Sequence, residues 1–220
     1  MQTLHRHVAE PSADTSGSVL RWARFYDAAV MLLTLGRAPA IRERTADLAA
    51  LQLGESVLEV GCGTGELAQR ARLRVGPTGR VYGIDPSAEM IAVARRKAAR
   101  AHLDVDYRVA AIEALPLGDA SVDVVLSSLM MHHLPGDLKS RGLAEVRRVL
   151  KPGGRLLIVD LQQPSGGLAR LALTSLIHGH MEHDVHDLPK LITAAGFEDV
   201  RDGETGFSWL GFAAGRAPRG

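Results

Sequence analysis

Three glycines in five residues separate an apolar run from a predicted helix, in the stretch VLEVGCGTGELAQR over 57–70. Glycines in such a loop permit positive φ angles and let a ligand touch bare backbone. The N-terminus of a following helix also favours an anionic group. The stretch therefore predicts a nucleotide-binding loop after a strand, with Gly61, Gly63 and Gly65 as its glycines. A tight turn with a purely structural role is the alternative.

The spacing of this loop favours a nucleoside with a cationic group over a dinucleotide. Dinucleotide loops read G-x-G-x-x-G, and this chain has Glu66 where the last glycine would stand. An acid there would repel a diphosphate but tolerate an ammonium or sulfonium group. Asp85 follows the glycines by the interval at which an acid accepts the ribose hydroxyls. An acid placed only to face a helix N-terminus is the alternative for Asp85.

Histidines form a second group of candidate residues. His132 and His133 follow a predicted strand, and the ordinary pKa of histidine suits a general base near neutral pH. A packing role at the start of a helix is the alternative. Four more histidines, interspersed with carboxylates, fall in the segment between the fifth strand and the last helix: His178, His180, His183 and His186. Such a segment could bind metal, but a pocket wall or solvated rim is the favoured reading, and we predict no metal site.

Alternating elements must position these residues. Apolar or β-branched runs predict five strands, over 56–60, 80–85, 104–110, 122–128 and 154–161. Helical segments lie between them, over 66–73, 87–101 and 137–150, with Ser87 as an N-cap. Strands and helices at this spacing form a parallel sheet covered on both faces, with ligands bound beyond the carboxyl ends of the strands.

The two ends of the chain differ from this alternating pattern. Two helices, over 22–35 and 38–53, precede the first strand. At the other end, a helix over 187–195 leads into strands over 198–202 and 207–214. Their short connection permits only an antiparallel pair, so we expect a C-terminal hairpin. We expect a disordered arm over 1–18 and one domain over 19–220, with an N-terminal helical lid over 19–53 and a substrate cap over 162–187.

Composition narrows the setting of the protein. The chain has 220 residues, 46% of them hydrophobic, and a formal net charge of +1, which favours neither nucleic acid nor a membrane surface as a partner. A single cysteine, Cys62, permits no internal disulfide, and no run has the length of a signal peptide or a membrane span. We therefore expect a cytoplasmic protein. An apolar helix over 168–177 could cap an acceptor or pair with a second copy in a homodimer.

Four motifs together resemble the class I S-adenosylmethionine-dependent methyltransferases, in the small-molecule (type 11) branch that includes ubiquinone and menaquinone C-methyltransferases. They are VLEVGCGTG, VYGIDPSAEM, IEALPLGDASVDVVLSSLMMHHL and LKPGGRLLIVD, in family order and spacing. The resemblance covers roughly 22–215. It implies a Rossmann-like fold, S-adenosylmethionine as cofactor with S-adenosylhomocysteine as product, and methyl transfer to O, N or C of a small, hydrophobic acceptor.

The resemblance also implies roles for individual residues. The glycine loop with Cys62 would line the methionine part of the cofactor, and Glu59 would support its amino group. Asp85 would hold the ribose, and His132 or His133 would act as base for an acceptor with an acidic proton. The remaining cofactor contacts implied by the resemblance are Tyr26, Pro86, Met90, Ile112 and Ser127.

One position departs from the family pattern. Ala111 stands where relatives carry an acid that binds the adenine amino group, although the Ile112 backbone can still donate to the ring. An unreplaced hydrogen bond to a charged group costs about 1.5–3 kcal/mol, or at least tenfold in affinity, unless Glu113 or water substitutes. A non-catalytic S-adenosylmethionine-binding module therefore remains an alternative, and a nicotinamide-dependent oxidoreductase is a third.

Overall fold

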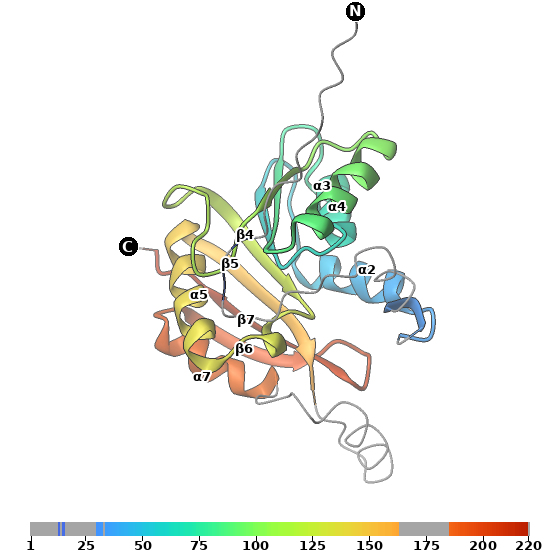
Figure 1. Ribbon diagram of the computed structural model, residues 1–220. Coiled ribbons are helices and arrows are strands. Elements are labelled where there is room, and N and C mark those ends of the chain that lie inside the picture. Colours follow the sequence, from blue (N-terminus) through green and yellow to red (C-terminus); the bar gives the residue numbers. More distant parts are fainter. Residues whose placement is uncertain (1–12, 14, 16–29, 33, 163–184, 220) are drawn as a thin grey trace, which may run out of the picture.

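A seven-stranded sheet with the order β3-β2-β1-β4-β5-β7-β6 forms the centre of the computed structural model, which describes residues 13, 15, 30–32, 34–162 and 185–219 (Figure 1). Strands β1 to β5 run parallel, and β7 is antiparallel to both β5 and β6. The predicted mostly parallel sheet and its C-terminal hairpin are thus confirmed. The strands are β1 (Ser56–Val60), β2 (Arg80–Asp85), β3 (Asp106–Val109), β4 (Val122–Ser128), β5 (Leu150–Leu161), β6 (Glu198–Glu204) and β7 (Leu210–Arg216).

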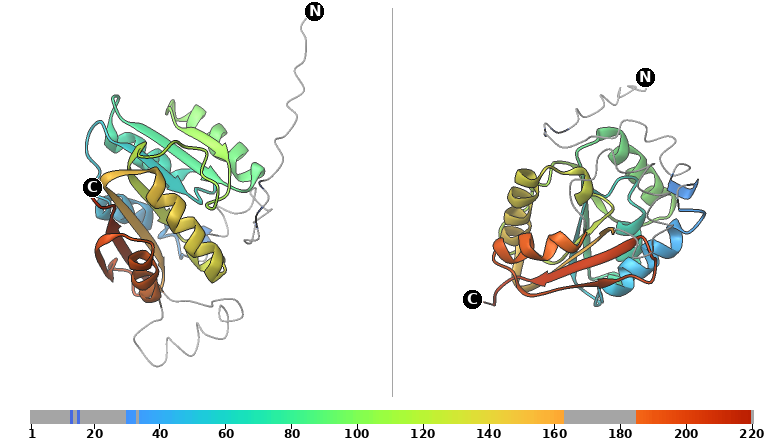
Figure 2. Two further views of the ribbon diagram at one scale, coloured as in Figure 1. Left: turned by 90° about the vertical axis from the view of Figure 1, so that its left-hand side faces the viewer. Right: turned by 90° about the horizontal axis from the view of Figure 1, so that it is seen from below.

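Helices cover both faces of the sheet, as the alternating sequence predicted (Figures 1 and 2). On one face, α2 (Ala38–Leu48), α3 (Glu66–Val75) and α4 (Ala88–Arg100) bury one apolar cluster against the strands. On the other face, α5 (Gly136–Val149) and α7 (Leu188–Ala194) bury a second. Short 3-10 turns, η1 (Met131–His133) and η2 (Val185–Asp187), precede α5 and α7. The central strands are buried on both sides, which explains their nearly continuous apolar runs.

The ends of several elements follow from local backbone geometry. Ser87 caps α4 by accepting a hydrogen bond from Met90 N at 3.4 Å, so the predicted N-cap is confirmed. The helix predicted over 38–53 ends earlier, at Leu48, because Ala50 and then Gly54 adopt positive φ angles that no helix can continue.

β5 begins at Leu150 rather than at the predicted residue 154. Val122 pairs with Leu150 while Val124 pairs with Arg155, so β5 carries extra residues between the two pairs. Pro152 and Gly153 lie in this irregularity, where the absence of an N–H and a positive φ are both tolerated. The strand predicted from residue 154 therefore starts earlier and contains a bulge.

Two other predicted strands are shifted. β3 is shorter than 104–110, and β7 begins at Leu210 instead of 207 because a turn holds the preceding residues. In that turn Thr205 Oγ1 donates to Leu210 O at 2.7 Å and accepts from Phe207 N at 3.2 Å. The arm over 1–18, the helix over 22–35 and the cap over 162–187 lie largely outside the described residues. Among the described helices, none is long and apolar enough to cross a membrane.

Candidate functional site

The glycine loop joins β1 to α3 at the carboxyl edge of the sheet. Cys62 N donates to Ile84 O at 2.9 Å, which ties the loop to the end of β2. Gly61 has a φ of 71°, and a β-carbon there would run into the side chain of Met130. Glycine is therefore needed at Gly61 both for its φ and for the space beside Met130. Gly61 and Gly63 both line the pocket beside the loop.

Tyr107, on β3, supports this loop from the other side. Its hydroxyl donates to Gly65 O at 2.8 Å, and the side chain is buried. A β-carbon on Gly83 would lie 2.6 Å from Tyr107 Cδ1, so the glycine of β2 makes room for the ring. This role of Tyr107 could not be predicted from the sequence, because only the order of the strands brings β3 close to the loop.

Asp85 closes the other side of the loop. Its Oδ2 accepts from Gly63 N and its Oδ1 from Ser87 N, both at 2.9 Å. Burial raises the pKa of this carboxyl group, and the two N–H donors oppose the shift. An ionised carboxylate has about four acceptor positions, and the backbone takes one on each oxygen. Asp85 can therefore still accept two hydroxyl groups from a ligand.

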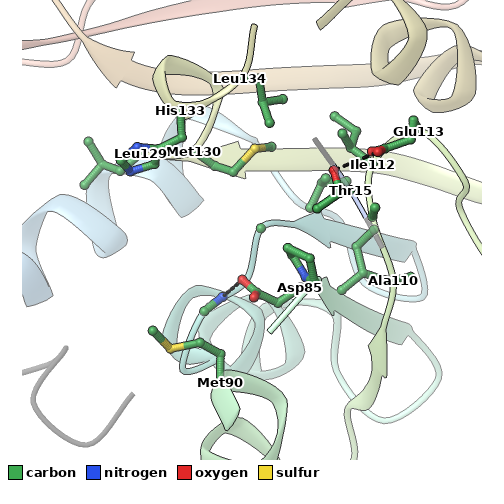
Figure 3. Close-up of a pocket in the computed structure, with 16 residues that line it drawn as sticks. Thr15, Asp85, Met90, Ala110, Ile112, Glu113, Leu129, Met130, His133 and Leu134 are labelled. Carbon is green, nitrogen blue, oxygen red and sulfur yellow. Dashed lines mark hydrogen bonds between the residues drawn. The ribbon is translucent and has the colours of Figure 1, made fainter. Parts of the chain in front are cut away.

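Figure 3 shows the pocket that opens above Asp85, between the loops after β1 to β4. It brings together most of the predicted site residues, includes Glu113, and adds several that the sequence did not indicate, among them Thr15, Met130 and Leu134. Its walls are polar near Asp85 and Glu113 and largely apolar along the loop after β4. The lining comprises Thr15, Val60, Gly61, Gly63, Ile84, Asp85, Pro86, Met90, Ala110, Ala111, Ile112, Glu113, Leu129, Met130, His133 and Leu134.

A second pocket lies across Gly61 and Leu129, which line both. Glu59, predicted to meet a ligand amino group, is only 3% exposed there, and its Oε2 has no hydrogen-bond partner among the described residues. Burial raises the pKa of Glu59 to about 8, although the Ala68 amide and Arg42 oppose the shift. The lining comprises Val30, Thr34, Ala38, Ile41, Arg42, Glu59, Gly61, Cys62, Thr64, Glu66, Leu67, Ser128 and Leu129.

The prediction that the charge of Glu66 would repel a diphosphate is wrong, because Glu66 forms two ion pairs. Arg42 Nη1 lies 2.6 Å from its Oε2, and Lys97 Nζ lies 2.7 Å from its Oε1. Two cations from α2 and α4 thus balance the charge that the sequence assigned to repelling a diphosphate. The steric part of the argument is unaffected, because Glu66 still occupies the place of the third glycine in a dinucleotide loop.

The two adjacent histidines have different environments. His132 Nδ1 lies 2.5 Å from Asp160 Oδ1, and His132 N donates to Asp160 Oδ2 at 3.1 Å. Asp160, on β5, is only 2% exposed, and its Oδ1 also accepts from Leu161 N at 2.8 Å. A carboxylate surrounded by N–H donors fixes the proton of His132 on Nδ1 and leaves Nε2 as the basic nitrogen.

His133 lines the pocket but is a weak base. Burial and the neighbouring His132 lower its pKa to about 4, and Asp160 offsets this only in part. The two imidazole rings lie 3.9 Å apart between centroids. At neutral pH His133 is therefore uncharged, and it contributes a wall to the pocket.

Several predicted residues do not line either pocket. Gly65 faces Tyr107, His132 faces Asp160, and Ser127 lies in the β4 ladder, so that Ser128 and Leu129 line the pockets in its place. Tyr26 and three of the four later histidines lie outside the described residues. The fourth, His186, lies 2.8 Å from Asp202. No cluster of three or more potential metal ligands occurs in the described part of the chain.

Together these features suit an extended ligand with a diol at one end and a cationic amine at the other. Asp85 offers acceptors for the diol, and the unpartnered oxygen of Glu59 offers one for the amine. The glycine loop lets the middle of such a ligand lie on backbone. His132 adds a nitrogen that can take a proton close to this edge of the sheet.

Comparison with known proteins identifies the class to which this site belongs. Residues 57–154 match a family described as "Methyltransferase domain". The ubiquinone/menaquinone biosynthesis C-methyltransferase UbiE of Rubrivivax gelatinosus is 32% identical over 198 residues, which are 80% of this chain and 76% of that protein. An arsenite methyltransferase of Halobacterium salinarum is 37% identical over 158 residues, which are 69% of this chain but only 39% of that protein. A crystal structure of an S-adenosylmethionine-dependent methyltransferase from Aquifex aeolicus superposes with a TM-score of 0.65 at 25% identity, over 80% of this chain and 89% of that one.

Proposed function

The chain belongs to the class I S-adenosylmethionine-dependent methyltransferases of the type 11 kind, and from this premise we propose that its acceptor is a small, largely apolar phenol or enol. The observation that carries the proposal is the contact between His132 and the buried Asp160. The methyl group would be added to the oxygen of such an acceptor or, for an enol, to the carbon next to the one that bears the oxygen. In either case the hydroxyl proton must be lost. S-adenosylmethionine supplies a methyl group on a positively charged sulfur.

We propose that the two pockets hold this cofactor from end to end. Asp85 would accept the ribose hydroxyls, and the unpartnered oxygen of Glu59 would accept the methionine ammonium group. Gly61 and Gly63 would let the cofactor lie against backbone between them. The fit is supported by the lone pairs left on Asp85 and by the position of Gly61, which lines both pockets.

His132 would take the acceptor proton on Nε2. Its Nδ1 lies against Asp160, so the ring cannot turn without breaking that contact, and the same carboxylate accepts from the backbone N–H of His132 and thereby stays in place. Fixed orientation and tautomer are what a general base requires. His133 is unsuited to this role, because a pKa of about 4 leaves it a weak proton acceptor at neutral pH.

The apolar side chains of the loop after β4 support the proposal of an apolar acceptor. Leu129, Met130 and Leu134 line the pocket beside the uncharged ring of His133 (Figure 3). A highly charged acceptor would lose hydration there without gaining a partner on these side chains. A small aromatic or enolic ring would instead bury apolar surface against them.

Arsenite, the substrate in the name of one relative, fits this chain less well. Trivalent arsenic favours soft thiolate ligands, and this chain has one cysteine, Cys62. That thiol is buried, and burial together with Glu59 and Asp85 raises its pKa well above the ordinary value. Cys62 therefore stays protonated and offers no thiolate to arsenic.

The proposal is tested by methyl transfer from isotopically labelled S-adenosylmethionine to a panel of phenols, quinols, enols, amines and arsenite. We expect labelled phenol or enol products only. His132→Ala should lower kcat by about 10²–10⁴-fold and leave the Kd for S-adenosylhomocysteine unchanged, since it removes the base but no cofactor contact. His133→Ala should change kcat by less than tenfold.

Three results would contradict this proposal in different ways. Methylation of arsenite or of amines alone would exclude the proposed acceptor. Equal losses of kcat in the two histidine variants would exclude His132 as the base. Tight cofactor binding without transfer to any acceptor would favour a non-catalytic binding module.

A further inference from the structure

We propose that Glu113, oriented by Thr15, accepts the adenine amino group of the bound cofactor in place of an acid at position 111. The inference rests on the proposed function, and it places adenine beside Ile112, as the family resemblance implies. It assigns the binding role to Glu113, which the sequence offered only as one possible substitute, and adds Thr15 as a positioning residue.

Ala111 itself has nothing to offer an amino group. Its side chain is a methyl group, only 6% exposed, in a pocket wall shared with Ala110 and Ile112. The loop turns directly after it, with Ala114 N donating to Ala111 O at 3.2 Å. An amino group at this end of the pocket therefore needs an acceptor from elsewhere, because an unpaired polar group is costly once buried.

Glu113 supplies a suitable acceptor from the same turn. It lines the same pocket, and its Oε1 accepts from Thr15 Oγ1 at 2.7 Å. Its Oε2 is buried and has no hydrogen-bond partner among the described residues. A buried carboxylate oxygen without a donor is unfavourable. An adenine amino group carries two N–H donors, so one of them could satisfy Oε2.

The N-terminal segment holds this carboxylate in place. Ala13 N donates to Pro86 O at 2.9 Å, and Thr15 donates to Glu113, so the segment bridges the loops after β2 and β3. Figure 3 shows Thr15 and Glu113 joined across the pocket from Asp85. The bridge spans the region between the proposed ribose and adenine positions. Cofactor binding would then depend on Thr15 as well as on the loops of the sheet.

A merely structural role makes a different prediction. If Glu113 only anchored Thr15, removing it would weaken all ligands alike, whether or not they carry an amino group. If Glu113 binds the amino group, its removal should affect only ligands that carry one. The comparison therefore needs a pair of ligands that differ in that group alone.

The experiment measures Kd by calorimetry for S-adenosylhomocysteine and for its analogue with hydrogen in place of the adenine amino group. The full-length wild type should prefer S-adenosylhomocysteine by about tenfold or more. Glu113→Ala should abolish this preference, and Glu113→Gln should retain part of it through its carbonyl oxygen. Thr15→Val should reduce it by about threefold, because the carboxylate loses its orienting donor. Ala111→Asp added to Glu113→Ala should restore it.

Glu89→Gln is the matched control, since Glu89 is an exposed acid in the first turn of α4 and should leave the preference unchanged. A full preference in Glu113→Ala would overturn the inference, as would an equal loss of affinity for both ligands. If the wild type bound S-adenosylhomocysteine but Asp85→Asn did not weaken it, the proposed cofactor placement would fail instead. Thermal unfolding of each variant shows whether it is folded, and Glu113→Gln tests the inference if Glu113→Ala is not.

Discussion

Asp85 and Asp160 lie at the same edge of the sheet, at the ends of β2 and β5, but their carboxylates accept hydrogen bonds from different donors. Among the described residues, Asp85 accepts only from the backbone N–H groups of Gly63 and Ser87, and it lines the pocket. Asp160 accepts from an imidazole as well as from backbone, and it lines neither pocket. One carboxylate faces the pocket, whereas the other contacts His132. Position at a strand end is thus shared by a proposed binding residue and a proposed positioning residue.

The largest effect on kcat is expected from a substitution of Asp160. Asp160→Asn would place an amide NH2 among N–H donors, which favours the wrong tautomer of His132. We expect kcat to fall by about 10²–10⁴-fold at saturating S-adenosylmethionine, with Kd for S-adenosylhomocysteine unchanged. Steady-state kinetics and calorimetry measure the two quantities.

Asp202→Asn is the matched control, because Asp202 pairs with His186 in an exposed part of the molecule. It should leave kcat within twofold of the wild type. If Asp160→Asn also stayed within threefold, the role assigned to Asp160 would be wrong. A large loss of cofactor affinity would show that the two carboxylates are not separate in function.

Glu59, near the end of β1, extends the comparison to a carboxylate with an unpartnered oxygen. Its pKa of about 8 in the folded protein exceeds the ordinary 4.5, so the folded state binds the proton more tightly than the unfolded state does. This contribution to stability is complete below about pH 4.5 and is lost as the pH rises toward 8. Relative to Glu59→Gln, the wild type should lose about 3 kcal/mol in free energy of unfolding between pH 5 and pH 8.

Urea unfolding of both proteins at several pH values measures this difference, and parallel profiles would contradict it. Binding offers an independent check on the same group. A ligand ammonium would favour the ionised carboxylate, so cofactor binding at pH 7 should release a proton from Glu59. Calorimetry in buffers of different ionisation enthalpy should detect this release in the wild type and not in Glu59→Gln.

The next largest effect concerns Asp85. Asp85→Asn keeps the size of the side chain but loses the charge, and its NH2 would oppose one of the two backbone donors. We expect the affinity for S-adenosylhomocysteine to fall by about 10–100-fold, with a smaller change in kcat at saturating cofactor. Asp106→Asn, on the neighbouring strand and paired with Arg108 near the surface, should bind normally. Unchanged binding in Asp85→Asn would refute the ribose assignment.

The two aspartates also show which site residues could be predicted from the sequence and which could not. Asp85 was predicted because its distance from the glycines is a local property of one strand-helix-strand unit. Asp160 was missed because GRLLIVDL resembles an ordinary buried strand, and its partner lies 28 positions earlier. Only the pairing of β4 with β5, with Ser128 beside Val159, brings the two together. A search for acids at every predicted parallel strand end would have found it, since those ends meet at one edge.

The same distinction between local features and contacts of distant elements explains where the prediction and the structure agree and where they differ. The parallel strands, the helices on both faces of the sheet and the N-cap at Ser87 depend on apolar periodicity and local capping, so they were predictable. The bulge in β5 and the partners of Glu66 depend on contacts between distant elements, which periodicity does not encode. Glu113 was noted as a substitute for an acid at Ala111, but its contact with Thr15 joins residues 98 positions apart and could not be predicted.

The smallest effect is expected from Tyr107, which supports the glycine loop but lines neither pocket. Tyr107→Phe removes the donor to Gly65 O, but that oxygen still accepts from Gln69 N at 3.1 Å. The carbonyl is therefore not left unpaired, and the loss should be about 1 kcal/mol of stability, or about 2–4 °C in Tm. Affinity for S-adenosylhomocysteine should fall by less than threefold, because the ring still packs beneath the loop. Tyr82→Phe, on the adjacent strand, is the control for loss of a hydroxyl. A tenfold loss of affinity in Tyr107→Phe would mean that this hydroxyl, more than Asp85, sets the geometry of the glycine loop.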